Sequence, residues 1–142
     1  SKAERAPSNL RKHFDLIRKT VGMASLKDTA ERLLALPTEG DEWLATAVDT
    51  FRRGSPTSAA LAWELQHRCR HRALSDVFRI EYNVAISCCA AHDFAEGVRA
   101  LLIDKDRSPK WDPPTLAAVE QKFIESHFRD HHDGAHPLSD WR

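Results

Sequence analysis

The charged loop from Asp104 to Trp111 contains the side chains best suited to binding an anionic ligand. Lys105 and Lys110 carry ammonium groups beside the large aromatic ring of Trp111. An ammonium group attracts phosphate or carboxylate, and an indole ring offers a flat surface for stacking. In the alternative, structural interpretation, the loop neutralises its own charges with acids such as Asp106, and its tryptophan anchors it to a helical core. The sequence leaves both interpretations open.

Cysteine and serine offer no convincing nucleophile in this sequence. Cys69 lies between His67 and His71, but residues two apart on a helix point away from each other, so a Cys–His dyad is excluded there. Cys88 and Cys89 lie in a stretch of small apolar residues, where cysteine is most simply a core residue. No Gly-x-Ser-x-Gly elbow is present in the sequence.

Two pairs of histidines have a spacing that could place them on one helix face. His67/His71 and His127/His131 are each four residues apart, but neither pair has a third and fourth ligand at a fixed spacing. We therefore expect solvent-exposed histidines and no metal. Candidate acid–base carboxylates are equally well explained as helix-surface or capping residues: Glu81, Glu96 and Glu120.

Charge is balanced overall but is distributed unevenly along the chain. Residues 1–72 carry 13 Lys/Arg and 9 Asp/Glu, whereas residues 73–142 carry 8 and 12. The densest basic cluster is His67–Arg72. A helix end rich in cations complements the helix dipole, and this is the simplest interpretation. Contact with nucleic acid or with an acidic protein surface is the alternative.

Composition and periodicity predict an all-α chain. Of 142 residues, 42% are hydrophobic and 30% are charged, and only 5 Gly and 1 Tyr argue against a sandwich or a barrel. No apolar run approaches the roughly 18 residues of a membrane helix, so no membrane association is expected. The three cysteines suit a reducing compartment. Apolar spacing predicts about seven short helices between residues 10 and 128, preceded by a disordered segment or linker over 1–9.

Local signals place the boundaries of these helices. One apolar stripe is predicted on a first helix from Leu10 to Val21. Further predicted signals are caps at Ser25, Ser55 and Ser75, a left-handed cap at Gly54, a helix from Phe94 to about Ile103, and a last helix that begins at Asp112. The His- and Asp-rich segment 129–142 is expected to be a flexible tail.

The segment from His92 to Trp111 resembles the C-terminal signature of 3-hydroxyisobutyryl-CoA hydrolases, in the enoyl-CoA hydratase (crotonase) superfamily. The sequence Phe-Ala-Glu-Gly-Val-Arg-Ala is shared loosely across the superfamily, whereas Leu-Ile-Asp-Lys-Asp-Arg-Ser-Pro-Lys-Trp is specific to the hydrolase branch. Ser55-Pro56-Thr57-Ser58 and Glu81-Tyr82 also match that branch. The resemblance covers roughly residues 10 to 128 and implies the C-terminal helical region of a crotonase-like α/β protein.

The resemblance implies that the catalytic groups lie elsewhere. In the family, an upstream α/β core carries the oxyanion-hole amides and the catalytic carboxylates, so no residue of this chain is assigned a catalytic role. A lysine near the end of related chains can approach the adenine or phosphates of coenzyme A, which implies Lys105 here, with Lys110 and Trp111 behind it. Coenzyme A enters as part of the substrate, and no separate cofactor is expected.

Two functions follow from the resemblance. The first is the C-terminal portion of an acyl-CoA thioester hydrolase of valine catabolism in the mitochondrial matrix, which supplies packing, subunit contacts and a wall for coenzyme A. The second is a non-catalytic component of a mitochondrial ribosomal small subunit. Both imply an upstream crotonase core, in the same polypeptide or in a separate chain, and an oligomer is expected. Helices that cover a core expose apolar faces when alone, so we predict a marginally stable or self-associating chain.

Overall fold

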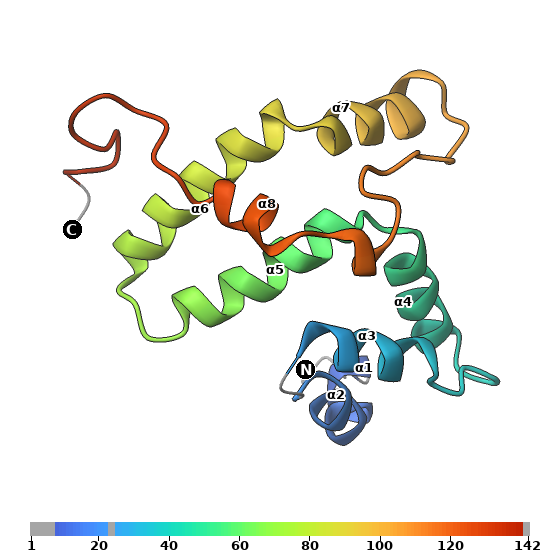
Figure 1. Cartoon of the computed structure of the whole chain (residues 1–142). Helices are drawn as coiled ribbons and strands as arrows, with labels where there is room; N and C mark the ends of the chain where they lie inside the picture. Colours follow the sequence, from blue (N-terminus) through green and yellow to red (C-terminus); the bar gives the residue numbers. More distant parts are fainter. Residues whose placement is uncertain (1–7, 23–24, 141–142) are drawn as a thin grey trace, which may run out of the picture. The chain divides into compact units, whose positions relative to one another are not determined.

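The described part of the chain belongs to the all-α class, as predicted. The computed structural model describes residues 8–22 and 25–140, and within them it contains helices and no strand (Figure 1). The chain divides into two compact units, residues 1–54 and 55–142. No described helix is long and apolar enough to cross a membrane.

The described part of the first unit contains four helices, and its predicted first helix is broken in two. The helices are α1 (Asn9–Lys12), α2 (Phe14–Val21), α3 (Leu26–Leu34) and α4 (Glu42–Arg53). His13 leaves helical geometry with φ −102° and ψ 11°, is only 7% exposed, and stacks on Trp43. Its Nε2 lies 2.7 Å from Oδ2 of Asp41. Because His13 turns inward, it interrupts the helix.

Most of the apolar stripe predicted on this first helix faces outward, and of its four residues Ile17 is half-buried. Leu10 and Phe14 are 64% and 61% exposed, and Val21 is also exposed. The spacing correctly indicated a stripe, but the core of this unit is built from other side chains, which include Ala30, Leu44 and Val48. In the native protein, such a stripe is either covered by a partner outside this unit or left in contact with water.

The predicted caps at the starts of two helices are confirmed, and the predicted cap at the end of α4 is wrong. The side chains of Ser25 and Ser55 accept backbone N–H groups from Asp28 and Ser58, as predicted. Gly54 follows α4, but its φ of −71° and ψ of 161° are extended, so the prediction of a left-handed cap was wrong. The extended conformation leads directly into the next helix, which leaves no room for a left-handed turn.

The second unit is built on two long helices that a short third helix bridges. These are α5 (Pro56–Cys69), α6 (Leu74–Ala90) and α8 (Gln121–Ser126). Figure 1 shows α8, in orange-red, between the green α5 and the yellow-green α6. Ile124 of α8 is 1% exposed, and Leu61 of α5 and Val84 of α6 are also buried. Ser87 of α6 donates to the carbonyl oxygen of His127 at 3.1 Å.

Two helix starts in this unit were predicted wrongly. Helix α6 begins after Ala73, whose side chain cannot cap, and Ser75 lies inside the first turn. The last helix does not begin at Asp112: the segment after it, which has a cis peptide bond before Pro113, forms only a 3-10 turn (Leu116–Ala118) before α8. Consecutive prolines fix φ but donate no hydrogen bond, so they did not establish a helix here.

The described part of the C-terminal segment contacts α6. Arg79 donates to the carbonyl oxygens of Leu138 and Ser139, and Asn83 donates to Asp130 at 2.8 Å. His136 makes an edge contact with the ring of Tyr82. Flexibility of residues 129–142 stays a prediction. The predicted linker 1–9 lies mostly outside the described residues, and α1 begins at its last residue.

Replacing Ser55 with Ala is expected to destabilise the second unit by about 1–2 kcal/mol. The hydroxyl of buried Ser55 caps α5 through the N–H of Ser58 and donates to a carboxylate oxygen of Asp93, so one substitution removes two part-buried hydrogen bonds. Thermal denaturation of Ser55→Ala beside Ser25→Ala, which removes a cap in the first unit only, measures the effect. Equal stability of Ser55→Ala and the parent would contradict this expectation.

Candidate anion-binding loop

The charged loop leaves the end of α7 through an unusual backbone path. Helix α7 (His92–Val98) continues into a π-helical segment (Arg99–Ile103), in place of the single helix predicted from Phe94. Lys105 and Arg107 then adopt φ angles of 57° and 54°. The left-handed conformation is unfavourable for residues other than glycine, and it persists only where the surroundings hold it.

Arg99 is the centre of the interactions that hold this loop. Its Nη1 donates to Oδ2 of Asp104 at 2.6 Å and to Oδ2 of Asp106 at 2.7 Å. Its Nε and Nη2 each donate to a different carboxylate oxygen of Glu96, both at 2.8 Å. Nη2 also donates to the carbonyl oxygen of Ser108 at 3.3 Å. Three carboxylates therefore converge on one guanidinium group.

Glu96 connects this cluster to the far end of the loop. Besides binding Arg99, it accepts the backbone N–H of Lys110 at 2.7 Å. The Arg99 guanidinium, followed by that N–H, lowers the pKa of Glu96 to about 2. The same guanidinium lowers the pKa of Asp106 and has its own pKa raised. Glu96 is therefore explained by loop structure, and the interpretation of it as a surface or capping residue was incomplete.

The start of α7 makes a second set of contacts to the loop. His92 Nε2 lies 3.0 Å from the carbonyl oxygen of Lys110, and Oδ1 of Asp93 accepts the N–H of Asp112 at 2.9 Å. The ring of Trp111 lies against Gly97: a Cβ added there would be 3.4 Å from the ring. Trp111 is half-buried, so it anchors the loop to α7 and keeps part of its surface accessible.

The loop does not neutralise its own cations. Asp104 and Asp106 pair with Arg99, and within the described residues no ion pair forms for Lys105, Arg107 or Lys110, which are all exposed. That part of the structural interpretation was wrong, because a helix residue outside the loop competes successfully for both acids. Sequence reasoning also missed Arg107 as a candidate anion ligand. The alternation of acid and base over residues 104–107 could have indicated it.

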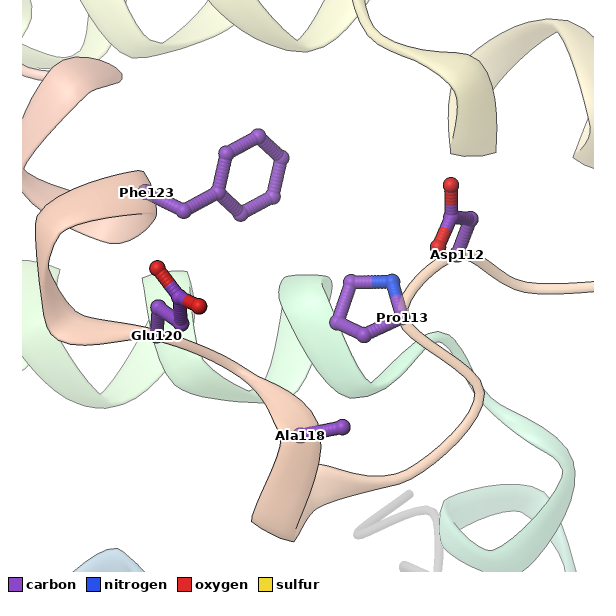
Figure 2. A pocket seen from close by; sticks show the side chains of 5 residues that line it. All are labelled: Asp112, Pro113, Ala118, Glu120 and Phe123. Atoms are coloured by element: carbon purple, nitrogen blue, oxygen red, sulfur yellow. The ribbon is translucent and has the colours of Figure 1, made fainter.

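A hollow of about 290 Å³ opens near the end of this loop. Figure 2 shows the five side chains around it, which come from the segment just after the loop, the 3-10 turn and the start of α8. The lining residues are Asp112, Pro113, Ala118, Glu120 and Phe123. Carboxylates repel phosphate, so this hollow is a poor phosphate site. Lys105, Lys110 and Trp111 are not among its lining residues.

Histidines and cysteines form no alternative centre in the described chain. Among those residues, no group of three or more His, Cys, Asp or Glu side chains could hold a metal ion. His127 is 3% exposed and its Nδ1 lies 2.9 Å from the carbonyl oxygen of Phe123, so the expectation of an exposed histidine was wrong there. Burial raises the pKa of the Cys69 and Cys88 thiols. Cys89 is exposed and is not a core residue.

The basic cluster at the end of α5 is largely engaged in contacts within its own unit. Arg68 forms ion pairs with Glu64 and Glu125 and lies 3.9 Å from the ring centroid of Phe128. Arg72 donates to the carbonyl oxygen of Arg68. Arg68 therefore joins α5 to α8, and the cluster is more than a solvated helix end.

These helices, with the Arg99-centred loop between them, define the class of protein. A family model for enoyl-CoA hydratase/isomerase matches residues 1–128, and the chain belongs to this family. It is the C-terminal helical region of the crotonase-like fold. An enoyl-CoA hydratase structure from Rhodobacter sphaeroides superposes with a TM-score of 0.77 at 28% identity, over 90% of this chain and 37% of that one.

Within the family, curated proteins similar to this chain include several named 3-hydroxyisobutyryl-CoA hydrolase, mitochondrial. The protein from Danio rerio is 35% identical over 122 residues, which is 86% of this chain and 31% of that protein. The protein from Homo sapiens is 32% identical over 84% of this chain and 30% of its own length. The chain thus spans about a third of the length of these relatives.

Acid titration is expected to show that the Arg99 cluster holds Glu96 ionised. Its pKa of about 2 lies below the ordinary 4.5, so its contribution to stability is fully present above pH 4.5 and is lost as the pH falls toward 2. Carboxyl carbon NMR of Glu96 measures the midpoint. In Arg99→Gln the midpoint should return toward 4.5. A midpoint near 4.5 in the parent protein would mean that the cluster does not form in solution.

Proposed function

We propose that this chain is the C-terminal helical portion of a 3-hydroxyisobutyryl-CoA hydrolase-like thioesterase. The observation that supports this most strongly is the combination of family membership with relatives of that name over most of this chain. The proposed reaction is hydrolysis of the 3-hydroxyisobutyryl-CoA thioester in valine breakdown. Its catalytic groups belong to an upstream crotonase core, and this chain contributes structure and substrate binding.

The binding contribution is assigned to the loop that follows α7. Lys105 and Lys110 would attract the phosphates of coenzyme A, and the accessible part of the Trp111 ring would lie beside the adenine. Support comes from the pairing of the loop acids with Arg99, which leaves these lysines exposed without ion pairs in the described structure. Coenzyme A is part of the substrate, and the proposal includes no separate cofactor or metal.

The packing contribution is assigned to the apolar surface of the π-helical segment and α7. Leu101, Leu102 and Ile103 are 62%, 63% and 69% exposed, and Phe94 is 53% exposed. Four neighbouring apolar side chains on one short segment are unfavourable in water. We assign the upstream core as their partner, since about two thirds of the length of the relatives lies outside this chain. Further contacts between subunits would form an oligomer.

We place the protein in the mitochondrial matrix, where valine breakdown would supply its substrate. The names of the curated relatives support a mitochondrial location. The ribosomal alternative has no support among the relatives described above, and Arg68 of the basic cluster is already paired within the chain. It is retained only as an outcome of the experiment that follows.

Gradient sedimentation of the native protein, tagged at the C-terminus and blotted for size, tests this proposal. We expect a band well above the 16.1 kDa of this chain in the light fractions, as for an enzyme that includes its core. Co-sedimentation with a ribosomal subunit would overturn the enzyme proposal in favour of a scaffold. A 16.1 kDa species without an associated core chain would also contradict it.

A further inference from the structure

We propose that Arg99 is the positioning residue of the anion-binding loop. By binding Asp104 and Asp106, it prevents these acids from pairing with the neighbouring cations, and it thereby leaves Lys105 and Arg107 available to an anionic ligand. The inference deepens the function proposed above and rests on it, because the ligand is taken to be the phosphate-bearing part of coenzyme A. It also adds Arg107 to the residues that bind this ligand.

Acidic and basic residues alternate along the loop, and Arg99 separates them. The carboxylates of Asp104 and Asp106 both accept from its Nη1 atom, at 2.6 and 2.7 Å. Lys105 lies between these acids and Arg107 follows them, and both cations are exposed. Asp104 and Asp106 each lie next to a cation in the sequence. Without the guanidinium group of Arg99, each carboxylate would be able to pair with that cation and neutralise it. Arg99 therefore decides which charges the loop presents.

Arg99 also supports the backbone conformation that the two cations require. Its carbonyl oxygen accepts the N–H of Asp104 at 2.8 Å, and the N–H of Arg107 binds the carbonyl oxygen of Ala100 at 3.0 Å. Asp106 in turn accepts the N–H of Ser108 at 2.8 Å. These bonds close the loop around the left-handed residues, whose unfavourable backbone must be held by its surroundings.

The guanidinium group acts through the loop and does not itself contact the ligand. A guanidinium has five N–H donors. In Arg99 these match five bonds: one from Nε and one from Nη2 to Glu96, one from Nη2 to Ser108, and one from Nη1 to each aspartate. With every donor engaged, Arg99 has none to offer a phosphate. Its effect on binding must therefore act through the residues that it positions, which are Lys105 and Arg107 through the two aspartates and Lys110 through Glu96.

Calorimetric titration of the whole native protein with coenzyme A, and with pantetheine as a probe without phosphates, tests this role. Arg99→Gln is expected to weaken coenzyme A binding about tenfold and to leave pantetheine binding unchanged, since only phosphate contacts are disturbed. In a Lys105→Ala/Arg107→Ala background its effect should be much smaller, because only Lys110 remains to be positioned through Glu96. Arg68→Gln, which removes an ion-paired arginine elsewhere in the same unit, is the matched control and should bind both probes normally.

The outcomes separate this inference from the proposed function. If Lys105→Ala/Arg107→Ala weakens coenzyme A binding and Arg99→Gln does not, the positioning role is wrong while the binding loop stands. If Arg99→Gln weakens pantetheine binding equally, or acts fully in the double-alanine background, its role is only structural. Normal coenzyme A binding by Lys105→Ala/Arg107→Ala would exclude these two cations as phosphate ligands, and the positioning role with them. Should Arg99→Gln not fold, Arg99→Lys, which keeps the charge but lacks the fork of donors that holds all three carboxylates, is expected to weaken binding about threefold.

Discussion

Charge reversal at both loop lysines, Lys105→Glu/Lys110→Glu, is expected to weaken coenzyme A binding to the native protein by about a hundredfold. A charge-assisted hydrogen bond to phosphate contributes about 1.5–3 kcal/mol, or about tenfold or more in affinity for each lysine. Neither lysine has an ion pair in the described structure, so their replacement leaves no buried partner behind. Loss of affinity would therefore report on the ligand and not on folding.

The measurement is a titration of the native protein at two salt concentrations. We expect the parent to lose affinity as salt is raised, because exposed charges are screened, and the reversed variant to be much less sensitive. Lys122→Glu, which reverses an exposed lysine on α8, serves as the control. Equal affinity of the parent and the Lys105/Lys110 variant would exclude these lysines as phosphate ligands.

Substitution of Leu101 and Ile103 by Asp is expected to disrupt the assembled protein. Each side chain is more than 60% exposed in this chain, and burying one against a core stabilises by about 1.5–3 kcal/mol. An unpaired carboxylate at such a contact costs several kcal/mol more. The double variant should therefore lose most of its soluble yield, or form an assembly with a much lower melting temperature.

The conservative pair Leu101→Met/Ile103→Leu is the control for this experiment, because it keeps apolar volume and should be nearly neutral. Differential scanning calorimetry and the soluble yield of the native protein are the readouts. If the Asp variant were as soluble and as stable as the parent, the π-helical segment would face water in the native protein. The assignment of the core as its partner would then be wrong.

The sequence predicted helix content well because periodicity and caps are local. Ser25 and Ser55 cap as expected, since an N-cap depends on neighbours within three residues. The break at His13 was not predictable in this way, because it depends on Asp41, which lies 28 residues further along the chain. For the same reason the spacing from Leu10 to Val21 identified a stripe but not the side that it faces.

The sequence identified residues of the candidate site, but it did not show how their side chains pair with one another. The cations and Trp111 are visible in the loop sequence, and their identity as candidates came from charge and family resemblance. The role of Arg99 was not visible, because the choice between two pairings of the loop acids depends on geometry. A π-helical segment places Arg99 where it reaches both acids. Single-sequence periodicity does not reveal such a segment.

Hydrolysis of 3-hydroxyisobutyryl-CoA by the native protein tests the central claim most directly. Release of the free coenzyme A thiol is followed for the parent and for Lys105→Glu/Lys110→Glu. We expect the parent to hydrolyse the thioester, and the variant to show a raised KM with a similar kcat, because the lysines bind the substrate and take no part in the chemistry. A folded native protein that neither binds coenzyme A nor releases thiol from this substrate would contradict the claim.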